Sequence, residues 1–170
     1  MSSQPAIEIL TADLHNPEHA RWIVELTDAY ARDPLGNGAP LPDSVLENLV
    51  TGLRAQPTAV VFLALARTGA SDPLPIGIAT CFGGFSTFSA RPLLNIHDLY
   101  VHPAYRSQGH ARRLLQAVEN RARATGCCKL TLEVLENNDP ARHAYANFGF
   151  AQAVYQEASG GALFFTKPLS

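Results

Sequence analysis

The chain has 170 residues, of which 46% are hydrophobic, 16% charged and 8% aromatic, and its formal net charge is −2. A chain of this length buries about two-thirds of its unfolded surface, so we expect one domain over residues 1–170. The apolar content excludes a disordered chain, and the longest apolar run, residues 59–66, is much shorter than the roughly 20 residues of a membrane span. The near-neutral charge argues against nucleic acid as a main partner, and we expect no membrane association.

The cysteines and the N-terminal residues predict a reduced, cytoplasmic protein. Cys81, Cys127 and Cys128 have no CxxC spacing and are odd in number, so we expect buried free thiols rather than disulfides or a zinc site. Residues 1–5 lack the basic and apolar regions of a signal peptide. The cytoplasm is therefore the expected location.

The first third of the chain predicts one strand and two helices. Weak alternation predicts the strand, apolar residues at helical spacing predict the helices, and dense Gly and Pro predict the loop between them. These elements are, in chain order, a strand at 6–10, a helix at 19–32, a loop at 33–40 and a helix at 43–54. Asp43 or Ser44 is the expected cap of the second helix.

The remainder of the chain predicts strands interspersed with two further helices. We expect strands at 59–66, 75–82 and 93–101, a helix at 109–125, a strand at 129–135, a helix at 139–148, and a closing hairpin of 151–156 and 162–166 around Ser159-Gly160-Gly161. The order β-αα-β-β-β-α-β-α-β-β predicts an α/β domain with a mixed sheet and helices on its faces.

The segment after the third central strand predicts an anion site. The strand ends at Pro103, a short polar loop follows, and the small residues Gly109 and Ala111 lie at the start of the long helix. The first amides of a helix are unpaired and its dipole is positive there, so a phosphate can bind. Arg106, Arg112 and Arg113 add positive charge, which is unfavourable at that helix end unless an anion is present. The alternative is a plain strand-to-helix turn with solvated arginines.

Two motifs in this order indicate a known family. The turn lacks the Gly-Lys-Ser/Thr of a P-loop and the three glycines of a dinucleotide fingerprint. It reads Arg106-Ser107-Gln108-Gly109-His110-Ala111, which matches Arg/Gln-x-x-Gly-x-Gly/Ala. A second segment matches Asn-x-x-Ala…Tyr-x-x-x-Gly-Phe, as Asn138-Asp139-Pro140-Ala141 and Tyr145-Ala146-Asn147-Phe148-Gly149-Phe150. Over residues 60–167 the chain therefore resembles the GNAT acetyltransferase superfamily.

The resemblance implies a fold and a co-substrate. It implies a GNAT-like, mostly antiparallel central sheet of about seven strands flanked by about four helices, and it implies acetyl-CoA. The residues expected to hold the CoA pyrophosphate are Arg106, Ser107, Gln108, Gly109, His110, Ala111 and Arg112. The backbone of Leu99, Tyr100 and Val101 would pair with the pantetheine arm as an added strand does.

The same resemblance assigns two residues of the second motif. Asn138 would bond the cofactor, and Tyr145 would protonate the departing CoA thiolate. A phenol with a pKa near 10 is protonated at neutral pH, so Tyr145 is available as the acid. The alternatives are a helix cap for Asn138 and plain packing for Tyr145.

A base is also needed, because a primary amine with a pKa near 10 is almost fully protonated at pH 7. His97 and Asp98 are polar where a buried strand should be apolar, and they point to opposite faces unless a bulge intervenes. The polyamine and diamine acetyltransferases carry an adjacent Glu-Asp at a similar place, where this chain has His97. A structural hydrogen-bonded pair is the alternative, and Glu133 on the fifth strand is a second candidate base acting through water.

The sequence therefore predicts an enzyme that transfers acetyl from acetyl-CoA to a primary amine of a small molecule by direct attack. Its acceptor would be a polyamine, a diamine or an amino-acid-like compound, and a homodimer is compatible with the resemblance because dimers are frequent among similar enzymes. We expect no metal ion and interpret His102, His110 and His143 as loop and surface residues. The alternatives are acetylation of a protein N-terminus or lysine, and a CoA-binding module without turnover.

Overall fold

A computed structural model describes residues 5–67, 72–154, 158 and 160–169. The chain divides into two compact units, Met1–Leu132 and Glu133–Ser170. The first unit holds the whole sheet and most of the helices, so it is described first.

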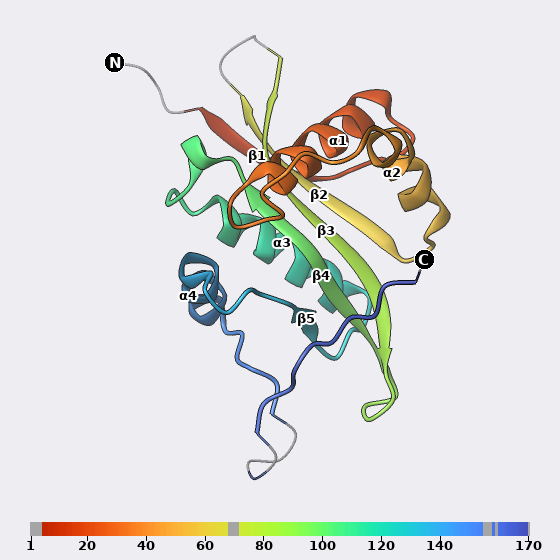
Figure 1. Cartoon of the computed structure of the whole chain (residues 1–170), viewed down its shortest axis with the longest axis vertical. Helices are drawn as coiled ribbons and strands as arrows, with labels where there is room; N and C mark the ends of the chain where they lie inside the picture. Colours follow the sequence, from red (N-terminus) through yellow and green to blue (C-terminus); the bar gives the residue numbers. More distant parts are fainter. Residues whose placement is uncertain (1–4, 68–71, 155–157, 159, 170) are drawn as a thin grey trace. The chain divides into compact units, whose positions relative to one another are not determined.

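The first unit is built on one five-stranded sheet in which each strand lies beside its sequence neighbour, in the order β1-β2-β3-β4-β5. The strands are β1 (Ala6–Thr11), β2 (Ala59–Arg67), β3 (Leu74–Ser86), β4 (Arg91–Val101) and β5 (Leu130–Leu132). All neighbouring pairs are antiparallel except β4 and β5, which are parallel (Figure 1). The prediction of a mixed, mostly antiparallel sheet is confirmed.

Helices cover both faces of this sheet. Helices α1 (Pro17–Arg32) and α2 (Asp43–Ala55) lie over one face, and α3 (His110–Ala124) lies over the other (Figure 1). A single 3-10 turn, η1 (Pro103–Tyr105), connects β4 to α3. The predicted cap of α2 is wrong, because Pro42 occupies the N-cap position and no side chain bonds the free amides there.

The core of the first unit lies on the α1–α2 face of the sheet. Its buried members are Trp22, Ile23 and Leu26 of α1, Val50 and Leu53 of α2, Val61, Leu63 and Leu65 of β2, and Ile78 and Tyr100 of the central strands. The three β2 residues alternate along the strand, as one face of a strand requires. Residues 62, 64 and 66 between them are also buried, because α3 covers the opposite face.

The second unit contains α4 (Asp139–Phe148). Asn138 caps this helix by accepting a hydrogen bond from the Ala141 N–H at 3.2 Å. Gly149 ends it in the left-handed conformation at φ +107°, which glycine adopts without strain. The predicted helix 139–148 is therefore confirmed.

The prediction of about seven strands is wrong, because the sheet of the described residues has five. In the predicted closing hairpin, the described residues form only a bridge between Val154 and Gly161 and one adjacent backbone bond. Residues 155–157 and 159 of that hairpin lie outside the described part of the chain. Strand β5 is also shorter than predicted, and Glu133 follows it rather than belonging to it. Alternation shows which residues suit a strand but not whether a partner strand lies beside them.

The thiols and the helices complete the description. Cys81 is buried as predicted, whereas Cys127 and Cys128 are only half-buried, and all three are free. Among the described residues, none of the helices has the length and apolar character that crossing a membrane requires.

We predict that Leu63→Ala lowers the free energy of unfolding by about 2–5 kcal/mol, because it opens a cavity where the side chain is fully buried. Urea denaturation measures the loss. The matched control is Leu74→Ala, whose side chain is 50% exposed and which we expect to change stability little. Equal losses in the two variants would contradict the described core.

Candidate functional site

Strand β4 has a free edge along its second half. Its pairing with β5 covers only Leu94, Asn95 and Ile96, whereas its pairing with β3 continues to Val101 (Figure 1). Residues 98–101 therefore have a strand on one side only within the first unit. Backbone groups on the other side of this stretch are available to a ligand that adds itself as a strand.

The hydrogen bonds show which residues of β4 present their backbone at this free edge. The His102 N–H donates to Ile76 O on β3 at 2.8 Å, so His102 faces β3. The Val101 carbonyl faces the opposite way and accepts a bond from Arg106 Nε at 2.9 Å. Because successive residues alternate, Leu99 and Val101 present N–H and C=O groups at the free edge, and Tyr100 faces β3. This sharpens the prediction, which named all three residues without distinguishing them.

The free edge leads into a turn that opens α3. Two residues of the turn have left-handed backbone, Ser107 at φ 60° and Gly109 at φ 82°. Gly109 is the N-cap residue of α3, so no side chain bonds the first amides of the helix, and the first turn contains no acidic residue. An uncapped helix start with exposed amides is a favourable place for an anion.

The arginines around this turn are held in different ways. Arg106 donates to Val101 O, pairs with Asp33 Oδ2 at 2.5 Å, and places its guanidinium 5.6 Å from the centre of the Tyr100 ring. Arg113 reaches Ile7 O on β1 at 3.4 Å. The sequence-based prediction of solvated or ligand-bound arginines did not foresee these internal partners.

His110 corrects the prediction of a surface histidine. Its side chain is 7% exposed and lies on the same side of α3 as Leu114, four residues on. Neither ring nitrogen has a hydrogen-bond partner among the described residues. Burial and the nearby Arg113 lower the pKa of this imidazole, so the ring is neutral at pH 7, while the His110 amide still belongs to the turn.

A β-bulge brings His97 and Asp98 to the same face of the sheet. Asp98 pairs with Thr80 and Ile96 pairs with Cys81, which leaves His97 without a partner on β3. The His97 ring contacts the Phe82 ring edge-on at 5.6 Å, and Phe82 packs against the core under α1 and α2.

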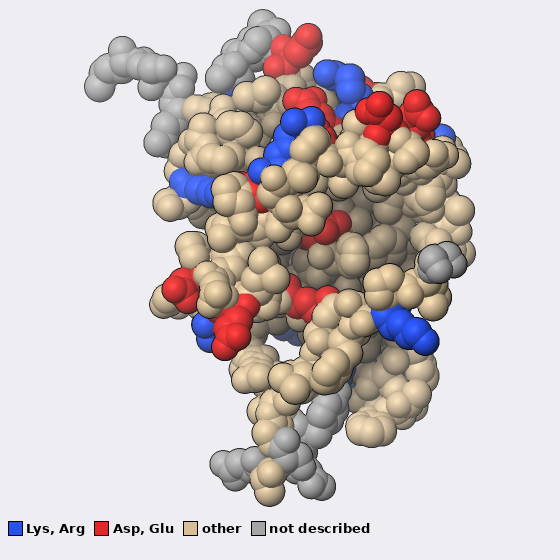
Figure 2. All heavy atoms as spheres, in the orientation of Figure 1, with Lys and Arg blue, Asp and Glu red and all other residues tan. Residues whose placement is uncertain are grey.

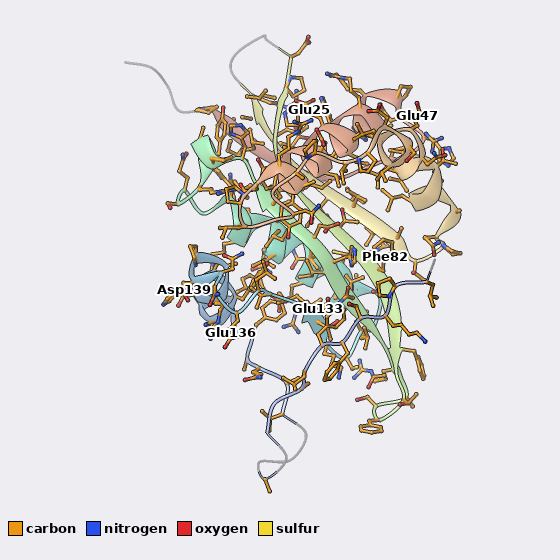
Figure 3. The ribbon with its side chains drawn as sticks, viewed as in Figure 1. Glu25, Glu47, Phe82, Glu133, Glu136 and Asp139 are labelled. Atoms are coloured by element: carbon orange, nitrogen blue, oxygen red, sulfur yellow. The ribbon has the colours of Figure 1, made fainter. Side chains whose placement is uncertain are left out.

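The face that Asp98 occupies follows from its neighbour two residues on, Tyr100, which belongs to that same core. Figure 3 shows Phe82 on the face of the sheet turned toward the viewer, where α1 and α2 also lie. Simple alternation, which predicted opposite faces, is therefore wrong at this position, and the bulge that the prediction allowed for is present.

The Asp98 carboxyl is held in an environment that favours its neutral form. Burial raises its pKa above the ordinary range, and the nearby His97 offsets part of that rise. No side-chain hydrogen bond to Asp98 is present among the described residues, so the structure lacks the satisfied pair that was the alternative interpretation. The ionised form of a half-buried carboxyl with a raised pKa binds a proton more strongly than an ordinary carboxylate does, which suits Asp98 to accept one from a substrate.

Asn138 and Tyr145, the other predicted site residues, belong to the second unit. Asn138 accepts the capping bond of α4 described above, so its alternative interpretation as a cap is confirmed. Tyr145 is half-buried on α4, and its ring meets the Phe150 ring at 5.9 Å. Glu133 is exposed and begins this unit, and its side chain is labelled in Figure 3.

A shallow groove of about 460 Å³ lies between α1 and α2. No residue of β4 lines it, so it is distinct from the free edge of that strand. Its lining is mostly apolar, and Glu25 and Glu47 stand at its margins (Figure 3). Acidic and basic side chains are interspersed over these two helices in the space-filling view (Figure 2). Within the described ranges, no group of three or more His, Cys, Asp or Glu residues has metal-binding geometry.

The sequence did not reveal Asp33 as a site residue. It was predicted only as the first residue of a loop, yet its side chain is 6% exposed and paired with Arg106, 73 residues away. Burial alone would raise its pKa, but the Leu35 N–H and the Arg106 guanidinium outweigh that effect and hold the pKa below the ordinary range. The one local feature that could have drawn attention to Asp33 is its position directly before Pro34, at the end of the predicted helix.

Comparison with known proteins now assigns the family. The model of the acetyltransferase (GNAT) family matches residues 12–150, which is most of the chain and includes both motifs. The chain therefore belongs to the GNAT acetyltransferase family.

Two curated relatives are each matched over less than half of their length. The ribosomal protein bS18-alanine N-acetyltransferase of Haemophilus ducreyi is 40% identical over 57 residues, which are 34% of this chain and 39% of that protein. Streptothricin acetyltransferase of Streptomyces lavendulae is 41% identical over 83 residues, which are 44% of each chain.

Among solved structures the likeness extends over nearly the whole chain. A probable acetyltransferase has a TM-score of 0.76 at 26% identity and covers 96% of this chain and 98% of its own. An aminoglycoside N-acetyltransferase in complex with CoA has a TM-score of 0.73 at 17% identity and covers 99% of both chains. The second likeness shows the fold alone.

We predict that Asp98→Asn raises the free energy of unfolding at pH 7. Because the folded-state pKa of Asp98 is raised, the protein is most stable below the unfolded-state pKa, near 4, where the carboxyl is protonated. The free energy of unfolding then falls as the pH rises through the folded-state pKa, because the buried carboxyl must ionise. The amide never ionises, so its advantage should be present at pH 7 and disappear below about pH 4. Urea denaturation at both pH values measures it, and a variant less stable than wild type at pH 7 would contradict the assigned environment.

Proposed function

We propose that the chain is an N-acetyltransferase that transfers an acetyl group from acetyl-CoA to a primary amine of a small molecule. The observation that carries this proposal is the continuous surface formed by the free edge of β4 and the uncapped start of α3. An extended arm can pair with the strand edge, and a phosphate can bind the unpaired amides at the start of the helix. Because the family match extends from the first unit to residue 150 of the second, we also propose that the two units act as one acetyltransferase domain.

Acetyl-CoA binds along this surface in the proposal. The amides of residues 107–111 hold the pyrophosphate, with Arg106 and Arg112 neutralising its charge. The pantetheine arm pairs with the Leu99 N–H and C=O and with the Val101 N–H, since the Val101 C=O already accepts a bond from Arg106. The Leu99 N–H, which has no strand partner in the first unit, donates to the thioester carbonyl and stabilises the negative charge that develops on its oxygen.

Acetyl transfer begins when the amine loses a proton. Asp98 and His97 face the same side of the sheet, and we propose that Asp98 accepts this proton, directly or through water, with His97 beside it. The amine nitrogen then attacks the acetyl carbon and the carbon–sulfur bond breaks, and the nitrogen gives up one further proton to water as the amide forms. Tyr145 protonates the departing thiolate, and the amide of Asn138 bonds the cofactor.

The acceptor is a small amine in this proposal, which includes the polyamine, diamine and amino-acid-like classes. The named relatives are enzymes for different acceptors, the bS18 alanine and streptothricin, so similarity alone does not choose between a small molecule and a protein. Acetylation of a protein N-terminus or lysine is the second candidate. A cytoplasmic location and a homodimer remain predictions from the sequence.

An acceptor screen tests this function. The protein is mixed with acetyl-CoA and, separately, with polyamines, diamines, amino acids, aminoglycosides and short peptides with free N-termini, and release of the CoA thiol is measured. Turnover with small amines alone supports the proposal. Turnover confined to peptides favours the protein acetyltransferase, and tight binding of acetyl-CoA without turnover on any amine would favour a CoA-binding module.

We predict that Gly109→Asp abolishes acetyl-CoA binding measured by calorimetry. The new carboxylate adds negative charge to the anion site, and the backbone at φ 82° resists a side chain. The matched control is Gly126→Asp, because Gly126 has a similar φ of 72°, open space around it and a place beyond the opposite end of α3. Binding retained in Gly109→Asp would place the pyrophosphate elsewhere.

We predict that Tyr145→Phe lowers kcat about tenfold or more, while the affinity for acetyl-CoA stays nearly unchanged, because only the proton donor is removed. Initial rates and calorimetry separate the two effects. Tyr105→Phe, a tyrosine of η1 with no assigned role in the reaction, is the control. A rate equal to that of wild type would limit Tyr145 to packing.

A further inference from the structure

The Asp33–Arg106 pair connects the loop after α1 to the turn that the proposed function assigns to acetyl-CoA. Arg106 lies in the turn proposed to bind acetyl-CoA, and Asp33 begins the loop after α1. Their side chains meet at 2.5 Å, with Asp33 6% exposed and Arg106 38% exposed. A partly buried pair of this kind is held more firmly than one on the open surface.

Asp33 also organises the loop that follows it. Its Oδ1 accepts the Leu35 N–H at 2.9 Å, and its carbonyl accepts the N–H groups of Gly36 and Gly38. At the far end of the loop, the Leu41 N–H donates to Asp28 Oδ1 at 2.8 Å. The loop from Asp33 to Leu41 is thus tied at one end to α1 through Asp28 and at the other to the β4–α3 turn through Arg106.

Contacts on the core side of the pair continue toward Asp98. The Arg106 guanidinium lies over the Tyr100 ring, and the Tyr100 and Tyr30 rings are 5.8 Å apart. Burial raises the pKa of Tyr30, and the negative charges of Asp98 and Asp33 raise it further. Arg106 is therefore the positive group in a cluster that otherwise contains two carboxylates and two phenols.

We propose that Asp33 is a positioning residue that couples the loop after α1 to the acetyl-CoA site, because Arg106 is shared between the Asp33 carboxylate and the phosphate of acetyl-CoA. This inference rests on the proposed function. In the structure Arg106 is held by Asp33 and the loop is tied to the turn. When a phosphate binds at the turn, it draws the guanidinium away from Asp33, and the loop loses that tie.

The proposed coupling and a purely structural role predict opposite changes in the affinity for CoA when Asp33 is replaced. An ionised carboxylate that holds Arg106 opposes anion binding at the turn, so its removal should strengthen the binding of CoA. Loss of a merely structural pair would instead loosen the turn and weaken that binding. The direction of the change in affinity therefore separates the two roles.

The experiment measures CoA affinity by calorimetry for wild type, Asp33→Asn, Arg106→Gln and the double variant. We expect Asp33→Asn to bind CoA about three- to tenfold more tightly, and Arg106→Gln to bind it about tenfold more weakly. In the Arg106→Gln background, the Asp33→Asn change should have no further effect. Asp33→Glu, which keeps the charge, should bind as wild type does.

Asp28→Asn is the matched control, because Asp28 also pairs with an arginine and bonds the loop but does not contact Arg106. Its CoA affinity should equal that of wild type. Hydrogen exchange gives a second readout: the Gly36, Gly38 and Ala39 amides should exchange faster in wild type when CoA is bound, and already in free Asp33→Asn.

Two failures can be told apart. If Arg106→Gln and Gly109→Asp both bind CoA as tightly as wild type, the proposed cofactor site is wrong. If those two variants lose affinity while Asp33→Asn binds no more tightly than wild type, the cofactor site stands and the coupling through Asp33 is overturned. Unfolding of Asp33→Asn would be seen by circular dichroism, and the loop exchange in wild type with and without CoA then decides the matter.

Discussion

The interaction on which the site depends is the change in pairing along β4. Within the first unit, the strand is paired on both sides up to Ile96 and on one side from Asp98 to Val101, with a bulge at His97 between the two parts. Pairing with β3 fixes the backbone of this stretch, so the Leu99 N–H and C=O and the Val101 N–H, which have no strand partner in the first unit, are held rigidly. A free edge in the middle of a rigid sheet is preorganised for an extended ligand, which lowers the entropic cost of binding it.

The same change in pairing explains the polar residues that interrupt the strand. A bulge turns His97 and Asp98 to one face, where Asp98 is half-buried and its pKa is raised. A carboxyl that lacks a hydrogen-bonded partner there destabilises the folded state at neutral pH. Proteins retain such groups where they serve a reaction, which is why a gain in stability on removing Asp98 would accompany a loss of function.

Local patterns predicted most of the fold and part of the site. The turn at residues 106–111 was found because its residue types alone determine an uncapped helix start. Pairing partners are not encoded locally, so the bulge at His97 was left open and the hairpin at 151–166 was predicted from alternation that does not form two strands in the described residues. Asp33 was missed for the same reason, because its partner lies 73 residues away.

The central claim is that the pantetheine arm of acetyl-CoA pairs with the free edge of β4 and that its pyrophosphate binds at the start of α3. Amide chemical shifts of the labelled protein, recorded with and without CoA, test it residue by residue. The account predicts large shifts for the Leu99 and Val101 amides and for residues 107–111, and a small shift for Tyr100, whose amide faces β3. Shifts of equal size at all three β4 residues, or none along the strand, would contradict it.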